Sequence, residues 1–162
     1  MNLISGAPEW LVWVLAGLLI LAAVEDGWRS RIANLTVMLI AAGAIVAAII
    51  AGPEVALWQN VAMMSALLGI GTIMFTRGWM GGGDIKLLAA SALWLDFSAG
   101  WKMLVAVSLA GGLETLLILI LRKLPWAEQW GTKSSIVRKR GGIPYGIAIA
   151  GGMLLTIVWS RG

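Results

Sequence analysis

Six long apolar runs constrain what this chain can fold into. They cover residues 10–24, 35–51, 56–76, 85–100, 101–121 and 143–159. Each approaches the roughly 20 residues that an α-helix needs to cross a hydrocarbon core about 30 Å thick. With 60% hydrophobic and only 12% charged residues, the chain is too apolar for an ordinary soluble domain. We expect an all-α polytopic membrane protein with about six transmembrane helices, forming one membrane-embedded domain over residues 1–162.

The basic residues predict how these helices are oriented. If the segment after the first run is cytoplasmic, ten of the twelve Lys and Arg residues lie on the inner side, and only Lys102 and Arg161 lie outside. Basic loops stay in the cytoplasm, so the split predicts an N-out, C-out arrangement. No basic region precedes the first run, which indicates an uncleaved anchor and not a signal peptide. The basic residues form no stripe suited to nucleic acid, and the expected surroundings are a lipid bilayer.

The residue inventory limits the chemistry that the chain can perform. It contains no cysteine and no histidine, which excludes a disulfide framework and a cysteine zinc site and removes the commonest metal ligand and general base. Any reaction must therefore rely on carboxylates, Lys, Ser, Thr or Tyr. We expect neither a cofactor nor a metal.

Two of the eight acidic residues occupy positions that suggest a function. Asp84 follows Gly81, Gly82 and Gly83 at the start of the fourth run, and Asp26 follows the first run. A carboxylate near hydrocarbon costs roughly 2.5–3.5 kcal/mol or more, so it usually faces a water-filled cavity and does chemical or transport work. Because two complete spans lie between the two acids, both are expected at the inner face.

Two carboxylates that face one cavity are the minimum set of catalytic groups that an aspartic protease needs. Close like charges do not both ionise easily, so such a pair shares a proton. The ionised member takes a proton from water while the protonated member polarises the scissile carbonyl. The three glycines before Asp84 offer φ > 0 conformations and let a substrate backbone approach that acid. Either acid could be the base, because the pair titrates as a unit.

Structural interpretations of these acids compete with the catalytic one. Asp26 could cap a helix or pair with Arg29, and Asp84 could cap the fourth helix through its free N–H groups. Glu25 is the rival of Asp26, although on a helix its side chain points about 100° away. Glu114, in the fifth run, is compatible with a proton path and equally with a hydrogen-bonded packing role.

Three segments resemble the type IV prepilin peptidases, specifically the short forms that serve Flp/Tad-type pili, which belong to the Gly-x-Gly-Asp intramembrane aspartyl proteases. They are residues 26–34 (Asp-Gly-Trp-Arg-Ser-Arg-Ile-Ala-Asn), 81–86 (Gly-Gly-Gly-Asp-Ile-Lys) and 142–148 (Gly-Ile-Pro-Tyr-Gly-Ile-Ala). The resemblance implies that Asp26 and Asp84 are the catalytic pair. The same segments supply the candidate substrate-binding or loop residues, which are Gly81, Gly82, Gly83, Lys86, Pro144 and Tyr145. Lys86 also fits an interfacial lysine whose amine snorkels to water.

The resemblance further implies a reaction and a location. Family members cleave the short basic leader of prepilins or pseudopilins at the cytoplasmic face of the bacterial inner membrane, so those substrates are the expected partners. Ala33 stands where the family usually has Pro, which relaxes the turn after the first motif. Longer members carry paired Cys-x-x-Cys motifs and N-methylate the mature pilin. This chain has no cysteine, so methylation is not expected.

Two other classes of function use the same residues differently. In a small proton- or ion-coupled transporter, Asp26 and Asp84 would be relay or binding groups. The clustering of both acids on one face and the lack of a visible inverted repeat argue against that class. In a non-catalytic assembly subunit of a secretion machine, both acids could be replaced without loss of function.

Overall fold

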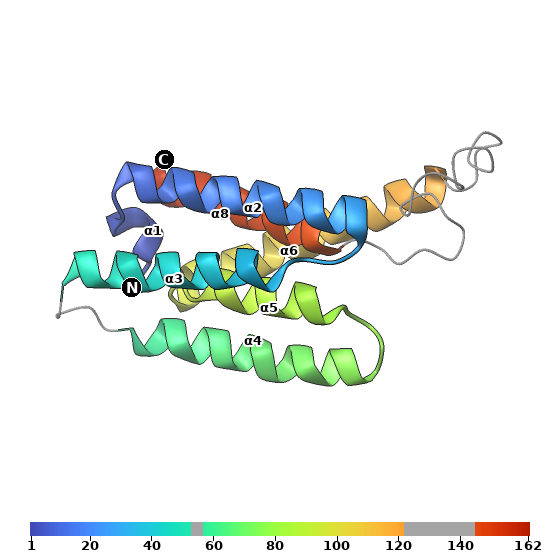
Figure 1. The fold of residues 1–162 in the computed structure, drawn as a ribbon, viewed down its shortest axis with the longest axis horizontal. Coiled ribbons are helices and arrows are strands. Elements are labelled where there is room, and N and C mark those ends of the chain that lie inside the picture. The colour runs from blue at the N-terminus through green and yellow to red at the C-terminus, as the bar shows by residue number, and fades with distance from the viewer. Residues whose placement is uncertain (53–56, 122–144) are drawn as a thin grey trace.

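A computed structural model describes residues 1–52, 57–121 and 145–162, and every element in these ranges is helical. Figure 1 shows long helices running side by side, with α1 crossing one end of the bundle. The helices are α1 (Leu3–Gly6), α2 (Glu9–Arg29), α3 (Asn34–Ala51), α4 (Trp58–Thr76), α5 (Gly82–Ala92), α6 (Phe97–Leu121) and α8 (Tyr145–Arg161).

Four of these helices, α2, α3, α4 and α6, are long and apolar enough to cross a membrane by length and composition, and α8 is an apolar helix of 17 residues. In hydrocarbon a backbone must satisfy its own hydrogen bonds, which a helix does within one segment. The chain is therefore an all-α polytopic membrane protein, as the sequence predicts. The N-out, C-out orientation stays a prediction.

The fourth and fifth apolar runs do not divide where the sequence predicts. Helix α5 ends at Ala92 after 11 residues, and α6 begins at Phe97, so the expected boundary at residues 100 and 101 is wrong. Asp96 causes the early start of α6, because its Oδ1 accepts a hydrogen bond of 2.9 Å from the N–H of Ala99 and thus caps the new helix. An 11-residue helix is about 16 Å long, roughly half of the hydrocarbon thickness.

Helices α5 and α8 form the centre of the bundle. Helix α8 packs against α2, α5 and α6, while α5 packs against α3, α4 and α8. Trp94, just after α5, is buried and donates from Nε1 to the carbonyl oxygen of Ile40 on α3 at 3.0 Å. A Cβ placed on Gly43 would lie 2.9 Å from the Trp94 ring, so the ring packs closely against α3 only because a glycine is present there.

Helix α1 is one element that the hydrophobic pattern does not predict. Asn2 caps it by accepting a hydrogen bond of 3.1 Å from the N–H of Ile4, and Leu3 and Ile4 are buried. Four residues are too few to produce a helical period in the sequence. This short helix packs against α3 and α8 and closes the end of the bundle opposite Asp26.

Candidate functional site

Asp26 lies in the last turn of α2 and is buried, with 5% of its surface exposed. Its Oδ2 accepts a hydrogen bond of 2.7 Å from the N–H of Gly146, in the first turn of α8. The first N–H groups of a helix have no partner within that helix, and the positive end of the helix dipole favours an anion there. Asp26 therefore ties the end of α2 to the start of α8.

Asp84 is also buried, with 7% of its surface exposed, and is the third residue of α5. Its carboxylate turns back toward the backbone N–H of Gly81, the residue that caps α5. An acid at this position commonly satisfies the N–H of the capping residue. A Cβ on Gly81 would lie 2.8 Å from Asp84 Oδ2, so this geometry requires a glycine.

Ile32 connects the surroundings of the two acids. Ser30 ends α2 in a left-handed conformation with φ of 51°, which turns the chain back toward the bundle. A Cβ on Gly83 would lie 3.4 Å from Ile32 Cβ, and a Cβ on Gly146 would lie 2.9 Å from Ile32 Cδ1. One buried side chain thus touches both the residue before Asp84 and the residue that holds Asp26. The two acids lie at one end of the bundle, close enough for Asp84 to experience the charge of Asp26.

Glu25, the neighbour of Asp26, has a different environment. Its Oε2 accepts hydrogen bonds from the N–H of Ala33 at 2.9 Å and from Oγ1 of Thr36 at 3.0 Å. Ala33 has no side-chain oxygen with which to cap α3, and Glu25 supplies an acceptor at that helix start. The side chain is therefore engaged in holding α3 against the end of α2.

The three glycines before Asp84 do not adopt the backbone conformation that the sequence analysis expects. Gly81 has φ of −71° and ψ of 145°, and Gly82 and Gly83 form the first turn of α5. Among the described residues, only Gly52 and Gly78 are glycines with positive φ, so the expected φ > 0 conformation is wrong. Helix formation explains the difference, since the first turn of α5 requires negative φ. Of the three, Gly81 has a steric reason for glycine, because a Cβ there would lie 2.8 Å from Asp84 Oδ2, whereas a Cβ on Gly82 or Gly83 would meet its nearest neighbour at 3.4 Å, an ordinary contact.

Lys86 lies on the outside of α5, away from the two acids. Its side chain is exposed, and Nζ donates a hydrogen bond of 3.0 Å to Oδ1 of Asn34 at the start of α3. Two residues along a helix correspond to a rotation of about 200°, which places Lys86 and Asp84 on opposite sides. Tyr145 opens α8 beside Gly146. Pro144 lies outside the described residues.

The neighbours that complete the surroundings of the acids carry little chemical signal in the sequence. Ile32 and Gly146 are apolar residues within motifs 26–34 and 142–148, and neither can take part in acid–base chemistry. Ile32 matters because its side chain contacts Gly83 and Gly146. Gly146 matters because its N–H binds Asp26. Within the described ranges, no group of three acidic side chains is placed to hold a metal ion.

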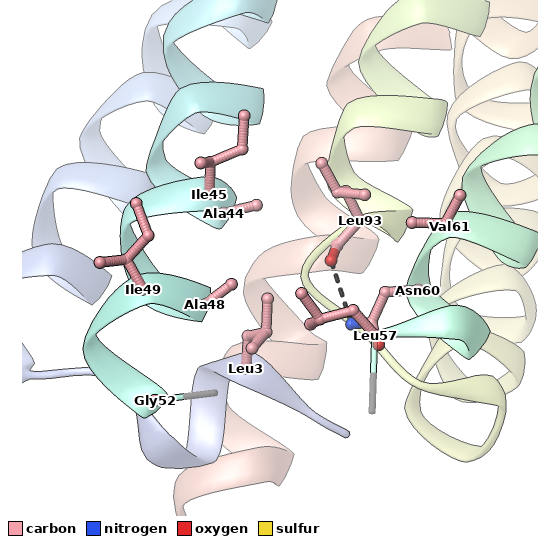
Figure 2. A pocket seen from close by; sticks show the side chains of 10 residues that line it. All are labelled: Leu3, Ala44, Ile45, Ala48, Ile49, Gly52, Leu57, Asn60, Val61 and Leu93. Carbon is pink, nitrogen blue, oxygen red and sulfur yellow. Dashed lines mark hydrogen bonds between the residues drawn. The ribbon is translucent and has the colours of Figure 1, made fainter. Parts of the chain in front are cut away.

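A cavity of about 520 Å³ lies at the end of the bundle remote from Asp26 and Asp84, and Figure 2 shows the side chains that line it. Its one strongly polar side chain, Asn60, donates from Nδ2 to the carbonyl oxygens of Leu93 at 3.1 Å and Met1 at 3.0 Å. Among the residues that the structure describes, no acid lines this cavity. The lining residues are Leu3, Ala44, Ile45, Ala48, Ile49, Gly52, Leu57, Asn60, Val61 and Leu93.

The fold and the buried acids define a class of protein, namely a helical membrane protein that holds carboxylates together at one end of its bundle. The model of the type IV leader peptidase family matches residues 13–120. The chain belongs to this family of peptidases. The matched range includes Asp26 and Asp84 and ends before α8. Comparison with curated proteins and with solved structures found no match.

Proposed function

We propose that the protein is a prepilin leader peptidase, a single membrane-embedded peptidase domain of the bacterial inner membrane. Its proposed substrates are type IV prepilins or pseudopilins of the Flp/Tad-like kind, cut after their short basic leader at the cytoplasmic face. The observation that carries the proposal is the pair of buried carboxylates, Asp26 and Asp84, at one end of a chain that belongs to a peptidase family. We refer to this pair as the dyad.

In the proposed reaction the dyad shares one proton between its two carboxyl groups. The ionised member removes a proton from a water molecule, and the water oxygen attacks the carbonyl carbon of the scissile peptide bond. The protonated member donates its proton to the carbonyl oxygen, which gives a neutral tetrahedral diol. Collapse of the diol breaks the C–N bond, one carboxyl group protonates the leaving amine, and the other takes back a proton from the diol. Water is the only co-reactant.

Backbone groups preorganise this chemistry. The N–H of Gly146 holds Asp26 Oδ2 at 2.7 Å, while Asp26 Oδ1 has no hydrogen bond among the described residues and is the oxygen available to water or substrate. Asp84 is oriented by the first turn of α5. Carboxylates held on rigid helices need little rearrangement on the way to the transition state.

The competing transporter hypothesis uses the same acids without a peptide substrate. Membership of a peptidase family favours hydrolysis over ion transport. N-methylation of the mature pilin is not part of the proposal, because the chain has no cysteine and lacks the Cys-x-x-Cys insert of the longer forms.

The test is leader cleavage of a candidate Flp-type prepilin in membranes that contain the full-length protein. We expect Asp26→Asn and Asp84→Asn each to abolish cleavage, while the amount of inserted protein stays unchanged. Asn keeps the shape of the side chain and a carbonyl oxygen for the N–H of Gly146, so the fold should survive. The matched control is Asp96→Asn, the same chemical change at the α6 cap, where Asn is as good as Asp. Full processing by either dyad variant would refute the catalytic assignment.

A further inference from the structure

Close packing of α6 against α8 places Glu114 next to the dyad. A Cβ on Gly152 of α8 would lie 2.9 Å from Cα of Val107 on α6, and a Cβ on Gly111 would lie 3.5 Å from Cβ of Ala148. The two contacts show that the helices run antiparallel, because the step from Val107 to Gly111 along α6 corresponds to the step from Gly152 back to Ala148 along α8. Glu114 is three residues beyond Gly111 on α6. Because Gly111 lies beside Ala148, Glu114 lies level with the first turn of α8.

That first turn is where Asp26 is bound. The N–H of Gly146 donates to Asp26 Oδ2, and the Glu114 carboxylate approaches the N–H of Ala148, two residues further along the same helix. The start of α8 thus receives carboxylates from two different helices, as expected for the positive end of a helix dipole. Glu114 also lies within range of the charges of both Asp26 and Asp84.

One oxygen of Glu114 is enclosed by protein. Glu114 Oε2 is inaccessible to solvent and has no hydrogen-bond partner among the described residues. A membrane-embedded acid is costly and usually has a function, and an enclosed oxygen without a donor adds to that cost. No part of the two-carboxylate mechanism uses Glu114, so its position requires a separate explanation.

Within the described ranges, the charges that act on Glu114 are those of two acids, Asp26 and Asp84. Helix α2 supplies Asp26, α5 supplies Asp84, and α8 supplies Tyr145 at its first residue. Lys86 on α5 is directed toward Asn34 and does not offset the negative charge. Three carboxyl groups this close do not all ionise together easily, so their protons are distributed over the whole cluster.

We propose that Glu114 is a positioning residue of the peptidase that sets the upper pH limit at which the dyad keeps its shared proton. The inference rests on the proposed function of Asp26 and Asp84 and extends it to a third carboxyl group. The ionised form of Glu114 repels a second negative charge on the dyad. The dyad therefore retains its single proton to a higher pH than two carboxyl groups alone would.

The sign of the effect follows from this repulsion. Removing a negative neighbour makes it easier for the dyad to lose its last proton. Activity requires that proton, so the basic limb of the profile of kcat/KM against pH should move to lower pH in Glu114→Gln. We expect a shift of about one pH unit, the size that a nearby like charge produces in a partly buried site. A purely structural role would lower kcat without moving the limb.

The experiment measures prepilin cleavage as a function of pH by the full-length protein in liposomes. Glu9→Gln is the matched control, because Glu9 starts α2 at the far end of the bundle and is exposed, and its profile should match that of the wild type. Glu114→Asp restores a carboxyl group and should return the basic limb toward its wild-type position. The Asp variant also tests the proposal if the Gln variant does not accumulate.

The outcomes separate this inference from the proposed function. A Glu114→Gln profile that superimposes on the wild type, or that is lowered uniformly at all pH values, would overturn the role of Glu114 while inactive Asp26→Asn and Asp84→Asn still support the peptidase. Active dyad variants would instead refute the proposed function itself.

Discussion

Gly146→Ala is the substitution that most directly tests how α8 holds Asp26. A Cβ at this position would lie 2.8 Å from Asp26 Oδ2, 2.9 Å from Asp26 Cβ and 2.9 Å from Ile32 Cδ1. Ordinary van der Waals contact begins near 3.4 Å, so Asp26 Oδ2 and the new methyl group must separate by 3.4 − 2.8 = 0.6 Å. Flexing of Ile32 cannot relieve the clash, because two of the three close atoms belong to Asp26.

The magnitude follows from the hydrogen bond that this movement breaks. The Gly146 N–H to Asp26 Oδ2 distance is 2.7 Å, and a displacement of 0.6 Å along the bond would extend it to about 3.3 Å, beyond the usual limit of about 3.2 Å. A hydrogen bond to a charged group contributes about 1.5–3 kcal/mol. If the catalytic geometry depends on this bond, its loss lowers kcat about ten- to hundredfold, because each 1.36 kcal/mol corresponds to a factor of ten.

The assay compares kcat for prepilin cleavage between Gly146→Ala and Gly151→Ala. Gly151 lies on the same helix, and a Cβ there would meet no atom within 4 Å. Alanine in a helix is favoured over glycine by up to about 1 kcal/mol, so the control should be fully active and at least as stable to heat. Wild-type turnover by Gly146→Ala, with the protein folded, would show that the contact with Asp26 does not support catalysis.

Two further predictions concern Glu25 and metal ions. Glu25→Gln should keep most of its activity and lose about 1 kcal/mol of stability, because Glu25 Oε2 caps α3 through Ala33 and Thr36. An inactive Glu25→Gln beside an active Asp26→Asn would show that Glu25, and not Asp26, is the catalytic acid. Chelators and serine-directed reagents should leave cleavage intact, since two carboxyl groups suffice to activate water. Loss of cleavage in EDTA and its recovery with one divalent metal would contradict the metal-free mechanism.

Span counting from the sequence places the two acids at one end, but it does not provide their contacts. Asp26 and Gly146 are 120 residues apart, and the bond between them depends on how α2 and α8 pack. The helices are apolar on nearly all sides, so hydrophobic periodicity does not indicate which face meets which neighbour. The same reason explains why the sequence leaves both roles open for Glu114, whose surroundings depend on the register of α6 against α8.

The sequence alone determined that this chain enters a membrane as helices, because 60% hydrophobic residues in runs of this length leave the backbone no other way to satisfy its hydrogen bonds in hydrocarbon. It also singled out Asp26 and Asp84, since buried acids are rare enough to stand out. Only the tertiary structure decided that α5 ends at Ala92, that Glu25 caps α3 and that Gly81 and Gly146 make room for carboxylates. The contact between Gly146 and Asp26 joins segments 120 residues apart. The contacts of Glu25 and Gly81 are local, but they depend on the path of the backbone between consecutive helices, which is set by how those helices pack.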